Sequence, residues 1–379
     1  MSNVFEHNLK IGVLGGGQLG RMLIQSAIDF NITLSVLDPD PHAPCAGISD
    51  FHCGAITDYD TVMVFGEACD LITIEIENVN TDALKALERA GKKVYPQPDI
   101  IALIQDKRTQ KQFFRERGIP TADFVLTEDR AHVLSHAEFL PAVHKLGRAG
   151  YDGRGVQILR SRDDLQKSFD APGVLEKLVD FTAEISVIVA RRPNGEMVSY
   201  PAVEMAFHAE ANLVEYLFSP AKLSADLLEK ADGIARKVAQ ELGIVGLLAV
   251  EMFATKQGEI LVNEIAPRPH NSGHHTIEAN VTSQYEQLLR VILDLPAGDT
   301  SVVSPSAMVN LLGEPGHSGP ARYMGFEEVL ALPGAHIHLY GKRLTKPFRK
   351  MGHVTIVDSN QERLFEKVDF VKQKLKVIA

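Results

Sequence analysis

The sequence predicts a mixed α/β and α+β protein of three domains, at residues 1–98, 99–300 and 301–379. A strand–helix–strand pattern around a glycine-rich turn near the N-terminus is typical of a Rossmann-like domain. In the middle of the chain, β-rich segments joined by short turns predict two lobes of mixed structure. After Pro296 the composition changes again, and short β segments predict a small β-rich domain. A chain of 379 residues has the length of two to three domains.

The N-terminal segment reads as one βαβ unit. An apolar strand over 10–14 runs into the turn Gly15–Arg21, a helix is predicted over 22–30, and a second strand over 33–37 ends at Asp38. The glycines of this GxGxxG pattern are Gly15, Gly17 and Gly20. Taken alone, the pattern predicts a dinucleotide site, with pyrophosphate at the helix N-terminus and Asp38 on a ribose. Because the pattern identifies the turn better than its ligand, a nicotinamide-dependent dehydrogenase stays open as one interpretation.

A further strand is predicted over 68–76, and two acids stand at its end. Glu75 and Glu77 share one face of the strand because side chains alternate. Acids at the carboxyl end of a parallel strand face the ligand crevice. We expect Glu75 to contact a ligand and Glu77 to be a solvated strand end.

One helix is predicted over 99–118, ended by a glycine and a proline. Three basic residues, Lys107, Arg108 and Lys111, lie along it. On composition alone, we expect most of them to be solvated.

A glycine-rich cationic loop follows a strand that ends near Lys145. Residues 147–155 contain four glycines and two arginines. Glycines let backbone N–H groups approach phosphate oxygens, and Lys145 adds a point charge. The alternative is a hairpin tip without a ligand. The next apolar strand, over 174–179, carries Glu176 and could clamp an adenine.

Two acids are predicted to face each other across a hairpin. A two-residue turn at Gln257–Gly258 would place Glu251 opposite Glu264. Like charges at facing positions repel, so the arrangement favours a cation between them. Two carboxylates beside Asn263 suit Mg²⁺, which completes its shell with water and nucleotide phosphates. A register shifted by one residue would instead leave two solvated carboxylates.

A polar loop, Ala266–His274, follows these acids directly. It holds one Arg, two His, one Asn and one Ser in nine residues. Loops of this kind carry function more often than cores do. We expect it to hold a polar anionic ligand beside Glu264, and a solvated surface loop is the alternative.

Composition excludes some classes of partner and compartment. The net charge of −10 and pI near 5.8 argue against a nucleic acid held on a basic surface. Cys45, Cys53 and Cys69 are odd in number and lack metal-type spacing, which favours reduced thiols. No signal-type segment and no apolar run of about 18 residues is visible, so we expect a cytoplasmic protein without a membrane partner.

The C-terminal region combines short strands with one helix. Strands are predicted over 307–312, 336–340 and 353–357, and an amphipathic helix over 361–374. The cationic segment 340–350 could close over an anion, or could be ordinary surface charge.

Four segments together resemble the N5-carboxyaminoimidazole ribonucleotide synthases of the ATP-grasp superfamily. They are GGGQLGRM at 15–22, AGYDGRG at 149–155, NEIAPRPHNSGHHT at 263–276 and KPFRKMGHV at 346–354. The resemblance implies a Rossmann-like N-terminal domain, a central ATP-grasp domain of two lobes and a small C-terminal domain. It also implies ATP- and bicarbonate-dependent carboxylation of 5-aminoimidazole ribonucleotide through carboxyphosphate, in purine biosynthesis. Mg²⁺ would be the metal and a homodimer the assembly. A sister ligase, such as the formate-using glycinamide ribonucleotide transformylase, remains an alternative.

The resemblance also assigns residues. For ATP it implies Lys107, Lys145, Gly150, Tyr151, Asp152, Gly153, Arg154, Gly155, Glu176, Val179, Glu184, His208, Asn263 and Glu264. For the ribonucleotide it implies Gln18, Glu75, Tyr151, Asp152, Arg268, His270, Asn271, Lys342 and Arg349. For Mg²⁺ it implies Glu251 and Glu264, and for catalysis Asp152, Arg268, His270 and Asn271. Asp152 is expected to orient or deprotonate the amine, and His270 to steady carboxyphosphate.

Overall fold

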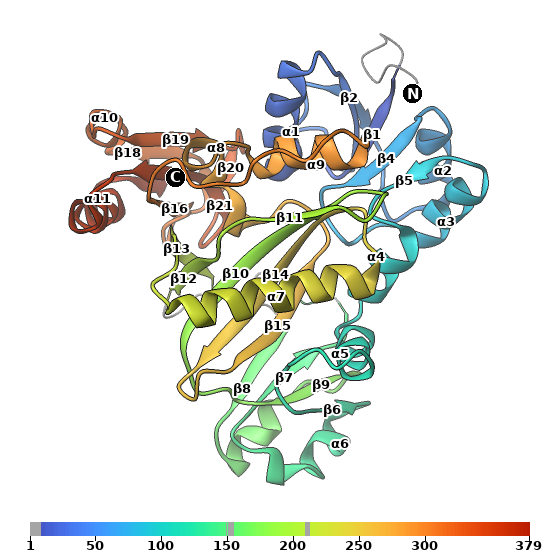
Figure 1. Ribbon diagram of the computed structural model, residues 1–379, viewed down its shortest axis with the longest axis vertical. Helices are drawn as coiled ribbons and strands as arrows, with labels where there is room; N and C mark the ends of the chain where they lie inside the picture. The colour runs from blue at the N-terminus through green and yellow to red at the C-terminus, as the bar shows by residue number, and fades with distance from the viewer. Residues whose placement is uncertain (1–8, 149, 151–154, 209–212) are drawn as a thin grey trace.

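The computed structural model describes residues 9–148, 150, 155–208 and 213–379. The chain forms an N-terminal parallel sheet, a small lobe, and a large antiparallel sheet that continues into the C-terminal region (Figure 1). The predicted mixture of α/β and α+β architecture is confirmed. None of the helices within these ranges is both long enough and apolar enough to cross a membrane.

The N-terminal domain is a doubly wound parallel sheet in the order β3-β2-β1-β4-β5. Its strands are β1 (Ile11–Leu14), β2 (Leu34–Asp38), β3 (Asp50–Cys53), β4 (Leu71–Ile74) and β5 (Lys93–Val94). Its helices are α1 (Gln18–Asp29), α2 (Tyr59–Glu67) and α3 (Thr81–Arg89). Every residue of β1 and β4 is buried, as expected for strands with helices on both faces.

The single helix predicted over 99–118 is wrong. The chain forms two helices, α4 (Pro98–Ile104) and α5 (Lys107–Glu116). The Asp106 carboxylate accepts the Arg108 N–H and caps the second helix, so the backbone breaks just before it. Lys111 is 2% exposed, on the face of α5 that also buries Phe114, which corrects the expectation that the basic residues are mostly solvated.

The small lobe is a four-stranded antiparallel sheet in the order β6-β9-β7-β8. Its strands are β6 (Phe124–Thr127), β7 (Ala142–Leu146), β8 (Val156–Leu159) and β9 (Gly173–Lys177), and α6 (Arg130–Leu134) lies beside them. β7 and β8 are neighbours, so the glycine-rich segment connects two paired strands as predicted.

The large sheet has nine strands, all paired in antiparallel fashion. They are β10 (Phe181–Arg191), β11 (Met197–Ser199), β12 (Val203–Phe207), β13 (Val214–Ser219), β14 (Gly246–Thr255), β15 (Ile260–Ala266), β16 (Ser306–Leu312), β19 (Ala335–Leu339) and β21 (Lys350–Val357). Because β13 pairs with β16, the sheet runs without interruption past residue 300.

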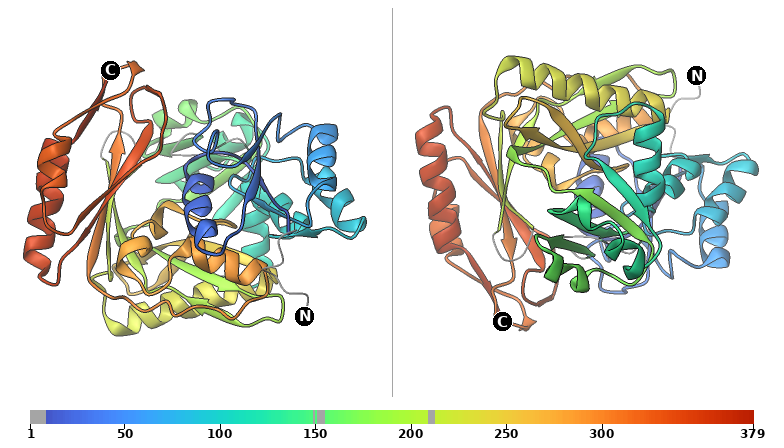
Figure 2. Two further views of the ribbon diagram at one scale, coloured as in Figure 1. Left: turned by 90° about the horizontal axis from the view of Figure 1, so that it is seen from above. Right: turned by 90° about the horizontal axis from the view of Figure 1, so that it is seen from below.

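Helices cover this sheet on its outer sides. Figure 2 shows α7 (Ala225–Leu242) along one side of the molecule and α11 (Gln361–Lys374) against the C-terminal strands. The bounds of α11 are those that the sequence predicts. The remaining elements are α8 (Thr276–Ala279), α9 (Gln284–Ile292), α10 (Phe326–Leu330), β17 (Gly319–Pro320), β18 (Arg322–Met324), β20 (Leu344–Thr345) and β22 (Lys376–Ile378).

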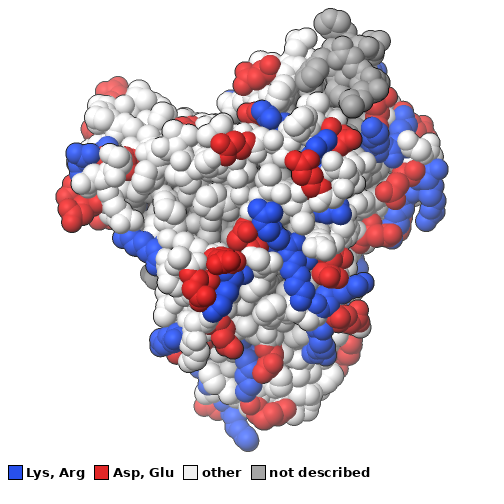
Figure 3. Space-filling model, viewed as in Figure 1, with Lys and Arg blue, Asp and Glu red and all other residues white. Residues whose placement is uncertain are grey.

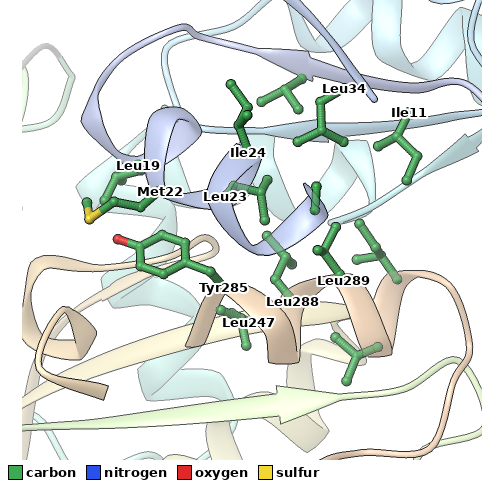
Figure 4. Packing of buried hydrophobic residues seen from close by; sticks show 14 of the residues in the cluster. Ile11, Leu19, Met22, Leu23, Ile24, Leu34, Leu247, Tyr285, Leu288 and Leu289 are labelled. Atoms are coloured by element: carbon green, nitrogen blue, oxygen red, sulfur yellow. The ribbon is translucent and has the colours of Figure 1, made fainter. Parts of the chain in front are cut away.

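The N-terminal domain is held to the large sheet by apolar packing of α1 on α9. Met22 and Leu23 face Tyr285 and Leu288 in one continuous cluster (Figure 4). All four side chains are nearly or fully buried, and each contributes roughly 1.5–3 kcal/mol when removed from water. This packing places the glycine-rich turn before α1 next to the loop that follows β15.

Two glycines of the α7 region give a matched test of this helix. Gly233 is exposed in mid-helix and a Cβ there would meet open space, so Gly233→Ala should stabilise the protein by about 0.5–1 kcal/mol. Gly243 ends the helix with a left-handed φ of 64°, so Gly243→Ala should destabilise it by about 1 kcal/mol, although its Cβ is equally unobstructed. The midpoint of thermal unfolding should rise for the first variant and fall for the second. Shifts of the same sign would contradict this account.

Candidate active site

A cleft with a volume of about 260 Å³ lies between the small lobe and the large sheet. Strands β7, β8 and β9 line one side, and β10, β14 and β15 line the other. The predicted site residues that it brings together are Lys107, Lys145, Gly150, Glu176, Val179, Glu184, Glu251, Asn263 and Glu264. Residues from five segments of the sequence therefore meet in one place.

One end of the cleft is apolar and aromatic. The rings of Phe181 and Phe253 are stacked with centroids 4.7 Å apart and an interplanar angle of 18°. Ile158, Leu178 and Phe207 lie at the same cleft. The sequence reasoning missed these residues. Phe253 could have been found, because it stands two positions after Glu251 and so shares its face of the strand.

The other end holds two lysines that are paired with acidic or amide side chains. Lys145 donates to Asn263 Oδ1 at 2.7 Å and lies 3.2 Å from the Glu176 carboxylate. Lys107 is paired with Glu264. Because the lysines stand on different segments from these partners, the pairs tie the small lobe and α5 to β15.

Glu251 and Glu264 are cross-strand partners, as predicted. The turn that the prediction assumed is wrong, however. Ala254 pairs with Ile260 and Thr255 donates to the Glu259 carbonyl, so the turn has three residues, 256–258, and near it the register is shifted by one position.

A β-bulge at Asn263 restores the register. Met252 pairs with Val262 and Glu251 with Glu264, which leaves Asn263 as the extra residue on its strand. A bulge changes the direction in which the side chains of its strand point. Here two successive polar residues, Asn263 and Glu264, both line the cleft, instead of alternating between the two faces of the strand.

The two facing acids are electrostatically unequal. Burial raises the pKa of Glu251, and the neighbouring Glu264 and Glu184 raise it further. The Lys107 ammonium lowers the pKa of Glu264. Burial also raises the pKa of Glu184 to about 7. The carboxyl groups of the cleft therefore cannot all ionise easily unless a further cation binds among them.

The glycine-rich turn of the N-terminal domain is already occupied by the protein's own carboxylates. Gly16 N–H donates to Asp38 at 2.7 Å, and Leu19 N–H donates to Glu75 at 3.0 Å. A Cβ on Gly17 would lie 2.5 Å from the Glu75 carboxylate, which explains the glycine there. These contacts contradict the dinucleotide interpretation, because N–H groups of the turn that would bind pyrophosphate already have acceptors, and both oxygens of Asp38 already accept backbone N–H groups.

Glu75 and Arg268 connect this turn to the polar loop after β15. Burial raises the pKa of Glu75 to about 7, although Arg268 acts in the opposite direction. Arg268 Nε lies 2.8 Å from Glu77, whose side chain is 22% exposed. The expectation that Glu77 is a solvated strand end is thus wrong. Gln18 is the first residue of α1, directly before Leu19.

The polar loop 266–274 is fixed, and the alternative of a solvated surface loop is contradicted. The buried Gln284 amide accepts the His270 N–H and donates to the His270 carbonyl, both at 2.9 Å. Asn271 and Asn310 exchange two amide hydrogen bonds of 2.9 Å. His270 Nε2 lies 3.3 Å from Glu251, which joins the loop to the acid pair. Asn310 lies 39 residues from Asn271, and Gln284 stands on a separate helix, so sequence spacing gave no signal for them.

Two buried histidines join the polar loop to the C-terminal strands. The rings of His274 and His353 lie 4.8 Å apart, and the hydroxyls of Tyr285 and Tyr340 each lie 2.9 Å from the Nδ1 of one of them. Burial holds the pKa of both imidazoles well below the usual value. A pair of neutral histidines therefore links two of the segments that carry the family resemblance.

The predicted C-terminal cations lie beside the N-terminal turn. Lys342 donates to the Lys350 carbonyl at 2.7 Å, and Arg349 donates to the Leu344 carbonyl at 2.6 Å. A Cβ on Gly341 would lie 3.5 Å from the Arg21 guanidinium, which brings this segment to the start of α1.

The remaining predicted residues belong to the two loops at the cleft. His208 packs edge-on against Phe348 with ring centroids 5.6 Å apart, while its neighbour Phe207 lines the cleft. Gly155 closes the glycine-rich segment with a φ of 73°, and its carbonyl accepts the Leu146 N–H. Tyr151, Asp152, Gly153 and Arg154 lie outside the described residues.

Three family models match successive parts of the chain. Residues 9–105 match a ribonucleotide synthetase preATP-grasp domain, residues 112–285 an ATP-grasp domain, and residues 306–367 a phosphoribosylaminoimidazole carboxylase C-terminal domain.

Curated relatives agree with these matches. The N5-carboxyaminoimidazole ribonucleotide synthase of Synechococcus elongatus is 40% identical, over 91% of this chain and 89% of that protein. The chloroplastic phosphoribosylaminoimidazole carboxylase of Vigna aconitifolia is 38% identical over 93% of this chain, which spans 65% of that protein's length.

Solved structures resemble the fold closely. The N5-carboxyaminoimidazole ribonucleotide synthetase of Thermotoga maritima matches with a TM-score of 0.91 and 40% identity, covering 98% of this chain and 99% of that one. The Aspergillus clavatus synthase in complex with ADP and 5-aminoimidazole ribonucleotide matches with a TM-score of 0.87 and 34% identity, covering 97% and 98%. From these similarities, the chain belongs to the N5-carboxyaminoimidazole ribonucleotide synthase family of ATP-grasp ligases.

Proposed function

We propose that this ligase carboxylates 5-aminoimidazole ribonucleotide to N5-carboxyaminoimidazole ribonucleotide, with ATP and bicarbonate, in de novo purine biosynthesis. The observation that carries the proposal is the 3.3 Å contact between His270 and Glu251. It places the polar loop, which would hold the acceptor, against the acids of the nucleotide cleft. The relative solved with ADP and 5-aminoimidazole ribonucleotide supports the same pair of ligands.

ATP would lie along the cleft with its base at the aromatic end. Phe181 and Phe253 offer a flat apolar surface to an adenine. Glu176, which the resemblance assigns to ATP, lines the same cleft with its carboxylate between Lys111 and Lys145. Val179 and Glu184 complete the adenosine end of the cleft, with His208 at its edge.

The triphosphate would extend toward Lys107 and Lys145. Both ammonium groups line the cleft at the end that also holds Asn263. The glycine-rich segment from Gly150 to Gly155, with Tyr151, Asp152, Gly153 and Arg154 in its centre, would close over the phosphates and keep water from the reactive intermediate.

Mg²⁺ fits the acid pair. Glu251 and Glu264 supply two hard oxygen ligands at facing positions. Within the described residues, no three His, Cys, Asp or Glu side chains could hold a metal by themselves. A two-carboxylate site suits an ion whose other ligands are phosphates and water. When bound, Mg²⁺ would neutralise charge that develops on the transferring phosphoryl group.

The acceptor site would lie between the N-terminal turn, the polar loop and the C-terminal cations. Its residues are Gln18, Glu75, Arg268, His270, Asn271, Lys342 and Arg349, together with Tyr151 and Asp152. Lys342 and Arg349 would hold the ribonucleotide phosphate. Asp152 would orient or deprotonate the amine, and His270 would steady carboxyphosphate.

The chemistry would proceed in two transfers. A bicarbonate oxygen attacks the γ-phosphorus of ATP, which releases ADP and forms carboxyphosphate. Carboxyphosphate breaks into CO₂ and inorganic phosphate, and the 5-amino nitrogen bonds to the CO₂ carbon as it loses a proton. Arg268, His270 and Asn271 act mainly by positioning and by stabilising negative charge.

Compartment and assembly belong to the same proposal. Cys45, Cys53 and Cys69 are free thiols, which suits a reducing cytoplasm. On the face shown in Figure 3, Lys and Arg alternate with Asp and Glu, which supports small-molecule substrates over nucleic acid. A homodimer is expected from the general prevalence of two-fold assemblies, and sedimentation at micromolar concentration tests it.

Substrate dependence of ADP release is the first test of the function. ADP should form with bicarbonate and 5-aminoimidazole ribonucleotide, and one ¹⁸O atom should pass from labelled bicarbonate into inorganic phosphate, because the attacking oxygen stays on phosphorus. Formate with glycinamide ribonucleotide should give no ADP, and the fluorescence of NADH should not change on titration. ADP release that needs formate instead of bicarbonate would reverse the assignment.

Replacement of one acid of the pair tests the metal site. Glu264→Gln keeps the size of the side chain but removes one negative charge from the ligand set. Turnover should fall at least about a hundredfold and the Mg²⁺ requirement should rise. Folding should survive, because the lost ion pair with Lys107 is offset in part by relief of the repulsion from Glu251. Steady-state ADP release over a range of Mg²⁺ concentrations measures both effects.

Glu259→Gln is the matched control for this variant. Glu259 stands on the same hairpin next to the turn and is exposed, so its replacement should change neither turnover nor the Mg²⁺ requirement. Full ADP production by Glu264→Gln at ordinary Mg²⁺ would show that the two acids do not share a metal.

A further inference from the structure

Lys111 is a buried cation outside the cleft. Its side chain, on α5, is 2% exposed, and it is not among the residues that line the nucleotide cleft. Its Nζ lies 3.1 Å from Glu176 and donates to Thr121 Oγ1 at 2.6 Å. Thr121 in turn donates to the Val262 carbonyl at 2.7 Å. Lys111 therefore connects α5 to β9 and, through Thr121, to β15, the strand that carries Glu264.

Glu176 lies between two lysines. Its side chain is 5% exposed. Lys111 of α5 lies 3.1 Å from its carboxylate, and Lys145 of β7 lies 3.2 Å from it. One negative charge is thus shared by two positive charges. The group of Lys111, Glu176 and Lys145 carries one net positive charge when all three are ionised.

This net charge determines how strongly Lys145 can attract an anionic ligand. Lys145 lines the cleft, and its side chain is 10% exposed. If Glu176 were paired with Lys145 alone, the pair would be neutral and would attract a phosphate only weakly. With Lys111 on the same carboxylate, the positive charge at the cleft wall is retained.

We propose that Lys111 is a positioning residue for the ATP phosphates: by sharing the Glu176 carboxylate, it keeps the charge of Lys145 available to the nucleotide. The inference rests on the proposed binding of ATP in this cleft. Lys111 acts through Glu176 and Lys145 and touches no reacting atom.

A purely structural ion pair is the competing account. Burial lowers the pKa of Lys111 to about 8, against the opposing effect of Glu176, so burying this charge costs more than the single carboxylate returns. Buried ion pairs are often no more stabilising than apolar side chains of similar size. Stability therefore gives a poor reason for a lysine at this position, whereas the charge of the cleft gives a specific one.

The test compares nucleotides that differ only in their phosphates. In Lys111→Met, the Kd of Mg²⁺-ATP should rise roughly tenfold while the Kd of adenosine stays within about twofold, as measured by titration calorimetry. Turnover at saturating ATP should fall less than kcat/KM for ATP. Lys111→Gln, which can still hydrogen-bond to Thr121, should behave alike and serves if the Met variant does not fold.

Arg115→Met is the matched control. Arg115 stands one turn further along α5, packs on Phe124 with its guanidinium 3.9 Å from the ring centroid, and contributes the same formal charge. Its replacement should leave the ratio of ATP to adenosine affinity unchanged.

A second substitution separates charge from packing. Lys111→Met/Glu176→Gln removes the carboxylate that would otherwise neutralise Lys145. Because Glu176 also lines the nucleotide cleft, the two variants are compared by the ratio of their Mg²⁺-ATP and adenosine affinities, which should be higher in the double variant than in Lys111→Met. Equal losses for ATP and adenosine in Lys111→Met, an unchanged ATP affinity, or no recovery in the double variant would overturn the proposal.

These measurements distinguish the two levels of inference. The Kd measurements need only equilibrium binding, so an error in the acceptor or in the chemistry leaves them valid. If the wild-type chain binds ATP but Lys111→Met is unaffected, the role of Lys111 alone is wrong. If the wild-type chain binds no ATP, both inferences fail.

Discussion

The facing of two carboxylates across one hairpin is the constraint around which the site is organised. Glu251 and Glu264 face each other directly, and like charges at facing positions repel. The surrounding contacts follow from this: the Lys107 ammonium approaches Glu264, and the His270 imidazole approaches Glu251. Because these partners come from α5 and from the polar loop, their contacts with the acids also bring the two halves of the site together.

The N-terminal domain shows how a familiar pattern can serve a different purpose. In a dinucleotide enzyme, the N–H groups after β1 bind the ligand's pyrophosphate. Here those N–H groups donate to Asp38 and Glu75, so they are already satisfied within the protein. Packing of α1 on α9 then places this turn beside Arg268 and the C-terminal cations. The domain thus contributes to the acceptor side without needing a nucleotide of its own.

Periodicity and turn chemistry predicted much of this fold, because they depend on neighbours in sequence. The helix at 361–374 and the facing of Glu251 and Glu264 could be read in this way. The facing was nevertheless reached through an incorrect turn, since nothing local signals the bulge at Asn263. Asp106 splits the helix predicted over 99–118 because its side chain, and not a glycine or proline, caps the backbone. Lys111 and Gln284 escaped notice for another reason: their partners stand on other elements, and a lysine or glutamine in a helix ordinarily faces solvent.

The uninterrupted nine-stranded sheet determines which parts of this protein can exist apart. β13 belongs to the central region and β16 to the C-terminal one, yet they are hydrogen-bonded neighbours, with Tyr216 opposite Val309 and Ser219 opposite Ser306. A chain shortened near residue 300 would expose the backbone edge of β13, and exposed edges of this kind recruit other strands. A boundary that is visible in composition is therefore not a place where the molecule can be cut. A fusion, truncation or domain exchange would have to keep β13 and β16 in the same molecule, whatever boundaries the composition indicates.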